Sequence, residues 1–353
     1  MEMLDYVKQT PGKIRENIND KEKLITPLVD LFKIRKYENV VIVASGSSLN
    51  AAMMATTYME KRLQCPVTAI TPELFELKQT LDFKKSFILF ISQSGASTNI
   101  LHALKYMNKV NAKKIVLTSN LKSEVAQHVD VAIDYGVGKE TVGYVTLGLS
   151  TLILYLAMFA NEVAIKRGQE SDLEEDFKQL PGLYEKTIEH SLGFVEEHYL
   201  TLAEMGPTFI CGNDINFGVA REAALKFQET LKIPTMHYEI EEFMHGPDIQ
   251  LTPQYTVFLI DNPEASERIE AIHHGLSEVI NKHYLLTNND HSDKENAILI
   301  PKSPIKELTA LITIPFFQVI AARMMPDLNK ESAHPFADKF MKNVPTKDYT
   351  EVH

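Results

Sequence analysis

Three charged residues and one histidine in the second half of the chain have the types and spacing that proton transfer requires. Glu222, Lys226 and Glu229 are four and three positions apart, so on a helix they lie within about 60° of one another. His245 follows sixteen residues after Glu229 and immediately precedes Gly246-Pro247, which indicates a loop of defined shape. A carboxylate and an imidazole can act as base and acid near neutral pH. A solvent-exposed ladder of ion pairs would show the same stripe, so both interpretations stay open.

A second group of residues, in the first half, could hold an anion. Two turns each follow an apolar run and precede a helical stretch, and their candidate ligands are Ser45, Gly46, Ser47, Ser48 and Ser92, Gln93, Ser94, Gly95, Ser97. Backbone N–H groups at a helix start lack intrahelical partners, and serine hydroxyls add further donors for a phosphate. The alternative for each turn is helix capping, which serine favours whatever the function. The occurrence of two such turns favours phosphate, and neither has the pattern of a dinucleotide or ATP site.

The elements that position these residues alternate between strands and helices. In the first half we expect strands over residues 40–44, 87–91, 114–118 and 129–133, and helices over 49–63, 100–109 and 145–167. In the second half we expect strands over 207–211 and 255–260, and helices over 215–231 and 265–276. This alternation predicts an α/β protein with doubly wound parallel sheets. Both serine turns then lie at carboxyl ends of strands, where such sheets bind ligands.

The spacing of the turns indicates a duplication. Ser45 and Ser92 are 47 positions apart, and Cys211 and Asp261 are 50 apart. The second copy has Gly212-Asn-Asp and Asp261-Asn-Pro in place of serines, so we expect the anion in the first domain. We expect an N-terminal helical lead-in over 1–36 and a first domain over 37–170. A helical linker around Pro181-Gly182 follows over 171–200, and a second domain with the charged stripe, the histidine loop and the tail covers 201–353.

Composition excludes several classes of function. The 353 residues carry a net charge of −11 without a basic cluster, which argues against nucleic acid and against an anionic membrane. The longest apolar stretch, 145–160, is interrupted by polar residues and is expected to be a buried helix. The N-terminus lacks an apolar signal core, so we expect a cytoplasmic protein. The 12 histidines show no metal spacing, and Cys65 and Cys211 are expected to be reduced thiols of the core.

The two serine turns resemble the phosphate-binding turns of the sugar isomerase (SIS) family, and Ser92-Gln-Ser-Gly95 is the most specific piece. The chain looks most like the isomerase half of glucosamine-6-phosphate synthase and its stand-alone relatives, the fructosamine-6-phosphate deglycases and glucosamine-6-phosphate deaminases. The resemblance runs from about residue 35 to the C-terminus. It implies two tandem SIS-type domains and a sugar 6-phosphate held by Ser48, Ser92, Gln93, Ser94 and Ser97.

The charged stripe is also similar to that family. Synthase isomerase domains carry Glu-x-Ala-Leu-Lys-x-x-Glu followed by His-Gly-Pro, and residues 222–229 and 245–247 match both the residues and the spacing. The resemblance implies that Glu229 moves the proton between C1 and C2, with Lys226 and Glu222 in support. It implies that His245 opens the sugar ring or is the acid/base partner, often in the neighbouring subunit's site, which makes a homodimer with shared active sites. It also implies a tail lysine, here Lys342, and requires neither metal nor cofactor.

Three departures narrow the expected activity. The chain shows no amidotransferase domain with an N-terminal cysteine, Ala96 replaces an acidic residue of the synthase turn, and Leu147 replaces a lysine. These departures favour a stand-alone deglycase or deaminase. It would convert a fructosamine 6-phosphate to glucose 6-phosphate and an amine, or glucosamine 6-phosphate to fructose 6-phosphate and ammonia. Two alternatives stay open: an aldose–ketose phosphosugar isomerase and a non-catalytic phosphosugar-binding regulator.

Overall fold

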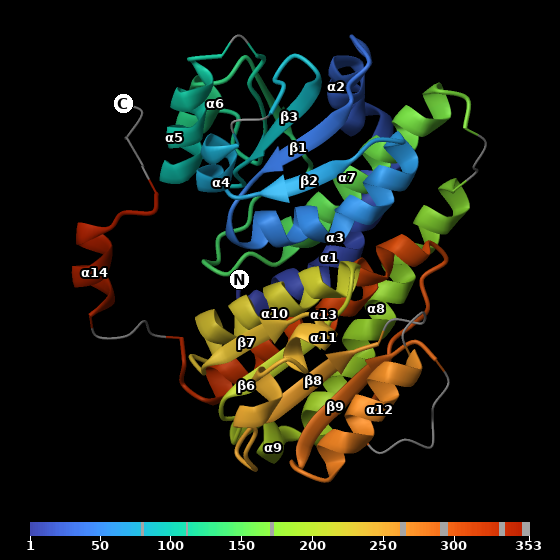
Figure 1. Ribbon diagram of the computed structural model, residues 1–353, viewed down its shortest axis with the longest axis vertical. Helices are drawn as coiled ribbons and strands as arrows, with labels where there is room; N and C mark the ends of the chain where they lie inside the picture. Colours follow the sequence, from blue (N-terminus) through green and yellow to red (C-terminus); the bar gives the residue numbers. More distant parts are fainter. Residues whose placement is uncertain are drawn as a thin grey trace. The chain divides into compact units, whose positions relative to one another are not determined.

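The computed structural model describes residues 1–78, 81–110, 112–169, 173–261, 266–289, 296–331 and 336–347. They form two compact units, each built on one sheet (Figure 1). The first-sheet unit comprises Lys13–Thr141, Leu147–Leu173 and Ala333–His353. The second-sheet unit comprises Met1–Gly12, Val142–Thr146 and Glu174–Ser332.

The first sheet has five parallel strands in the order β2-β1-β3-β4-β5. These are β1 Asn39–Val43, β2 Val67–Ile70, β3 Ser86–Ile91, β4 Ile115–Thr118 and β5 Val131–Asp134. All six residues of β3 are buried, as expected for a strand that is covered on both faces. In the first 166 residues of the chain the helices are α1 Met3–Asn19, α2 Lys21–Lys33, α3 Gly46–Leu63, α4 Pro72–Leu77, α5 Thr98–Met107, α6 Glu124–Gln127 and α7 Leu147–Lys166.

The second sheet repeats this topology, with five parallel strands in the order β10-β9-β8-β6-β7. Its strands are β6 Thr208–Gly212, β7 Thr235–Tyr238, β8 Thr256–Ile260, β9 Lys282–Thr287 and β10 Ala297–Leu299. The remaining helices are α8 Glu174–Glu197, α9 Tyr199–Ala203, α10 Ile215–Thr230, α11 Ile240–Phe243, η1 Pro247–Gln250, α12 Ser266–Ser277, η2 Lys306–Leu308, α13 Thr309–Asp327 and α14 Ala337–Asn343. The predicted α/β fold with two parallel, helix-flanked sheets is therefore confirmed.

Each sheet has its own apolar core. Residues of α5, including Leu101 and Leu104, pack against strand residues such as Phe90 in the first-sheet unit. Residues of α11 and α12 pack against Phe209 and Cys211 in the second-sheet unit. Burial raises the pKa of the Cys211 thiol well above its ordinary value, which fits an unreactive core residue. Cys65 is only half-buried, in contrast to the expectation that both thiols lie in the core.

Two helices are apolar on nearly every side. By length and composition alone, Leu147–Lys166 and Lys306–Asp327 could cross a bilayer, but 89% of the apolar window of each is buried inside the protein. Core helices pass the same length test, so these two are weak evidence for a membrane. The first was expected as a buried helix. The second was not expected, and Pro315 and Pro326 both lie inside it.

Several expected boundaries shift. The helices after the serine turns begin at Gly46 and Thr98 rather than at 49 and 100, so the first turn takes part in helix formation. Pro181 lies inside α8 and does not interrupt the expected linker. Strands β2, β7, β9 and β10 were not predicted. Of the expected turn at 261–264, only Asp261 belongs to the described residues.

Candidate active site

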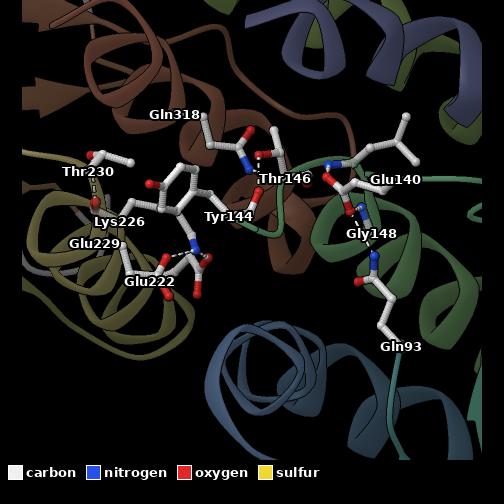
Figure 2. A network of polar contacts seen from close by, with 11 residues as sticks. Gln93, Glu140, Tyr144, Thr146, Gly148, Glu222, Lys226, Glu229, Thr230 and Gln318 are labelled. Carbon is white, nitrogen blue, oxygen red and sulfur yellow. Dashed lines mark hydrogen bonds and ion pairs between the residues drawn. The ribbon is translucent and has the colours of Figure 1, made fainter. Parts of the chain in front are cut away.

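The charged stripe on α10 forms a cluster around a buried ammonium group (Figure 2). Lys226 Nζ lies 3.5 Å from Glu222 Oε1 and also donates a hydrogen bond to Glu229 Oε2. The Glu222 and Lys226 side chains are 0% and 1% exposed, whereas that of Glu229 is 34% exposed. The exposed-ladder interpretation therefore fails for two of the three residues, and Glu229 alone combines contact with the cluster and access to solvent.

The position of α10 explains this burial. The helix packs against β6, β7 and α13, so more than one of its faces is covered. Small residues at Ala220, Ala223 and Ala224 are fully or almost fully buried, which lets neighbouring elements approach the helix closely. A charged pair enclosed in this way must satisfy its charges internally.

Lys226 is held in its charged form. Burial lowers the pKa of Lys226, but the charges of Glu222 and Glu229 and their hydrogen bonds raise it, and the net direction is upward. Because folding raises this pKa, the stabilising contribution is complete below the unfolded value of about 10.4 and is lost only as pH rises through the folded value. The ammonium therefore stays cationic at neutral pH.

We expect Lys226→Met to lower the free energy of unfolding by about 3–5 kcal/mol, because it leaves a buried carboxylate without its cation. Urea unfolding would measure the change. Lys178→Met is the matched control, since Lys178 contacts Glu174 and Glu175 at the same two spacings on the exposed surface of α8. We expect the control to behave like the parent chain. Equal effects of both variants would mean that burial of the α10 cluster does not contribute to the free energy of unfolding.

The two serine turns lie together at the carboxyl edge of the first sheet. Strands β1 and β3 are neighbours, and Asn99 Nδ2 of α5 donates to Ser45 Oγ at 2.8 Å, which joins one turn to the helix that follows the other. Ser45 and Ser97 occupy the N-cap positions of α3 and α5, yet neither side chain makes a capping hydrogen bond. In the same unit Thr71 does cap its helix. The capping alternative thus fails for Ser45 and Ser97, whose hydroxyls form hydrogen bonds with Asn99 and Ser92 instead.

The second turn is fixed by its backbone. The carbonyl oxygen of Gln93 accepts hydrogen bonds from Thr118 Oγ1 at 3.2 Å and from Ser119 Oγ at 2.8 Å. Gly95 has φ +69°, and a Cβ there would lie 1.9 Å from Ser123 Oγ. Only glycine fits this position. Ser92 Oγ and Ser97 Oγ are 2.9 Å apart across the turn, and Ser94 Oγ accepts from the Ala96 amide at 3.3 Å.

Sequence reasoning missed Glu140. Its Oε1 accepts from the Leu147 amide at 3.0 Å, and its Oε2 accepts from the Gly148 amide at 3.2 Å and from Gln93 Nε2 at 2.7 Å (Figure 2). The Gln93 side chain therefore contacts this carboxylate at the start of α7. A Cβ at Gly148 would lie 2.0 Å from Gln93 Oε1, so the glycine makes room for the contact. Glu140 is a single glutamate in a loop, and no motif around it indicated these contacts with Gln93 and the start of α7.

The C-terminal segment reaches the second serine turn. The Thr98 amide, at the first position of α5, donates to Thr346 O at 3.2 Å, and Lys347 forms an antiparallel bridge with Ser97. Lys342 lies exposed on α14. Within the described part of the chain, the tail thus brings the backbone of Lys347 to the turn, and the role of Lys342 stays a prediction.

His245 belongs to the same unit as the charged cluster. Its imidazole is exposed, and Nδ1 lies 2.6 Å from Glu241 O. Arg268 donates to both carboxylate oxygens of Glu241, at 2.7 and 3.0 Å, and this pairing lowers the pKa of Glu241. The φ of +132° at Gly246 sets the turn that follows. Among the described residues, no hydrogen bond or ion pair joins His245 to Glu229.

Among the described residues, no group of three or more His, Cys, Asp and Glu side chains could hold a metal ion. The fold and these sites define a class of protein with two sheets of one topology, serine-rich turns at the edge of the first and a buried charged cluster beside the second. The chain belongs to the SIS domain family, whose model matches residues 33–161 and 204–325. The sequence resemblance to this family is therefore confirmed.

Comparisons with individual proteins agree. The chain is 26% identical over 252 residues to glutamine–fructose-6-phosphate aminotransferase of Thermococcus kodakarensis, in an alignment that covers 69% of this chain and 41% of that protein. The chain thus spans about two fifths of the length of that relative. A Clostridium difficile 630 structure assigned as a phosphosugar isomerase has a TM-score of 0.86 with 22% identity and 99% coverage of both chains. Glucosamine-6-phosphate deaminase of Thermotoga maritima has a TM-score of 0.77 with 21% identity, covering 95% of this chain and 98% of that one.

Proposed function

We propose that this protein is a phosphosugar deglycase or deaminase that moves a proton between C1 and C2 of a fructosamine 6-phosphate or of glucosamine 6-phosphate. The observation that carries the proposal is the buried Lys226–Glu222 pair with the one-third-exposed Glu229 beside it. In a ladder of ion pairs on a surface helix, all three side chains would be exposed to solvent, and here two of the three are buried. A base that removes a carbon-bound proton must be positioned firmly and yet reach its substrate.

Each member of the cluster has a role in this chemistry. Glu229 takes the proton from one carbon and returns it to the next. This leaves a C=N bond, which water hydrolyses to the carbonyl of the hexose phosphate with release of the amine or ammonia. Lys226 holds the Glu229 carboxylate in position by a hydrogen bond and stays cationic. Glu222, fully buried, keeps that ammonium in place. His245 supplies an acid or base for ring opening, in a homodimer that shares its sites.

The substrate's phosphate binds at the serine turns of the first sheet. The hydroxyls of Ser45 and Ser97, which do not cap their helices, and the start of α3 support an anion there. Ser48, Ser92 and Ser94 add further hydroxyls on the same edge. Binding energy from the phosphate, remote from the reacting carbons, can hold those carbons in place for the proton transfer.

We expect Ser97→Ala to weaken binding of glucose 6-phosphate by about tenfold or more, because a hydrogen bond to a charged group is lost. Equilibrium titration would measure this change, with unphosphorylated glucose as the ligand control. Thr71→Ala is the matched variant, because Thr71 Oγ1 accepts from the Leu74 amide as a true cap. It should cost about 1 kcal/mol of stability and leave affinity unchanged. Equal affinities of parent and Ser97→Ala would argue against phosphate at this turn.

Mass spectrometry of products from a panel of substrates tests the proposed function. The panel contains fructosamine 6-phosphates, glucosamine 6-phosphate and free hexose 6-phosphates. Release of an amine or ammonia with a hexose phosphate supports the proposal. Interconversion of free hexose phosphates alone would identify an aldose–ketose isomerase. Saturable binding without turnover of any member would identify a phosphosugar-binding regulator.

A further inference from the structure

We propose that the carboxyl edge of the second sheet holds a ligand site of its own, for a small primary ammonium group. The proposal goes beyond the proposed function and does not depend on it. Going along the chain from β6, β7 is added on one side and β8 on the other, so the connections change direction between β6 and β8. Open α/β sheets bind ligands in the crevice at such a point. In the first sheet the corresponding place, between β1 and β3, is occupied by the serine turns.

Polar side chains from three elements meet at this edge. Asp261 follows β8 and is 5% exposed, and its Oδ2 accepts from Thr287 Oγ1 at 2.7 Å and from Asn289 Nδ2 at 3.0 Å. Asn216, in the first turn of α10, donates its Nδ2 to Asp261 O at 2.9 Å. The cluster is therefore assembled from β8, the end of β9 and the start of α10.

Asn216 leaves one strong acceptor unused. The residue is 3% exposed, and its buried Oδ1 has no hydrogen-bond partner among the described residues. The amide head that carries Oδ1 also carries the Nδ2 that contacts Asp261, so both atoms lie at the same edge. Buried acceptors in folded proteins are almost always paired, and an unpaired one costs free energy unless a donor arrives. This acceptor therefore points to a ligand with a donor.

The backbone is shaped to hold Asn216 there. A Cβ at Gly212 would lie 2.7 Å from Asn216 O, so only glycine permits the close approach of β6 to α10. Asp214, between them, has φ +50° and ψ −124°, an unfavourable combination for a residue with a side chain. Such strain persists where the surrounding structure requires a particular geometry.

The chemistry of this edge is the opposite of that in the first sheet. The serine turns offer hydroxyl and amide donors, which suit an anion. The second edge offers a carboxylate and an unpaired amide oxygen, which suit a cation with N–H donors. A primary ammonium group matches both properties. The free ammonium ion and the head of an alkylamine share this chemistry.

Calorimetric titration of the full chain at constant ionic strength tests the site. We expect ammonium or methylammonium to bind, and tetramethylammonium, which has the same charge but no N–H donor, not to bind. Asn216→Leu should weaken binding at least about tenfold, since one buried hydrogen bond is lost. Asp261→Asn keeps the shape, removes the charge and should weaken binding similarly. The matched control is Asn39→Leu, which removes another buried, unpaired amide oxygen, at the first residue of β1, and should change nothing.

The outcomes separate the alternatives. Binding of ammonium alone identifies the free ion as the ligand, and binding of both ions identifies an amine head. If tetramethylammonium or potassium binds as well as methylammonium does, the effect is that of any cation and the proposal fails. Unchanged affinity in Asp261→Asn also overturns it, and this variant decides the question if Asn216→Leu does not fold. Turnover assays on the same samples test the proposed function separately, so failure of the ammonium site can be told apart from failure of the proposed function.

Discussion

Glu229→Gln is expected to bind substrate within a few-fold of the parent chain and to turn it over at least ~100-fold more slowly, the usual size of a general-base contribution. The amide keeps the size of the side chain and can still accept a hydrogen bond from Lys226, so the cluster keeps its shape. Only the basicity is removed. Steady-state kinetics together with an equilibrium Kd would separate the two effects.

The control for this prediction lies on the exposed surface. Glu175→Gln removes the carboxylate that contacts Lys178 at the same three-residue spacing on α8, and it should leave turnover unchanged. Turnover of Glu229→Gln within tenfold of the parent chain would mean that Glu229 is a structural member of the α10 cluster and not the base.

A mixture of Glu229→Gln and His245→Ala chains, each nearly inactive alone, is expected to recover about a quarter of the parent activity. The exposed imidazole of His245 makes no hydrogen bond or ion pair with Glu229 in the described part of its own chain, which fits a role in a neighbouring chain's site. A mixed dimer then has one site with both lesions and one intact site. Random reassortment makes about half of all dimers mixed, which gives the expected fraction.

Subunit exchange must be verified for this test, for example with two differently tagged chains that are captured together. Activity that stays at the level of the separate variants after exchange would place both residues in one chain's site. It would contradict the shared-site proposal and leave the role of Glu229 intact.

Much of the fold could be predicted from local sequence. The apolar runs before Ser45 and Ser92 are strands because consecutive buried residues suit a sheet covered on both faces. Strands such as β2 and β7 escaped prediction because they are four residues long and only partly buried. Helix α13 was not predicted either, and it has two prolines inside it, residues that seldom occur in a helix interior.

The site was predictable in its residue types and less so in its environment. The spacing of Glu222, Lys226 and Glu229 fixes one helical face, but an exposed face and a buried face have the same spacing. Burial depends on α13 and the strands that pack on α10, which lie far away in the sequence. The contacts of Glu140 with Gln93 and of Lys347 with Ser97 are also long-range, and local patterns carry no information about them.

The fate of a carbon-bound deuterium tests the central claim most directly. The substrate would be a fructosamine 6-phosphate with two deuterium atoms on C1, or glucosamine 6-phosphate with one on C2, as the product panel selects. Proton transfer by Glu229 predicts that one deuterium leaves its original carbon, either to the neighbouring carbon or to solvent, in step with release of the amine. Products that form at the full rate and keep all deuterium on the original carbon, as direct displacement of the amine by water would give, would contradict the account.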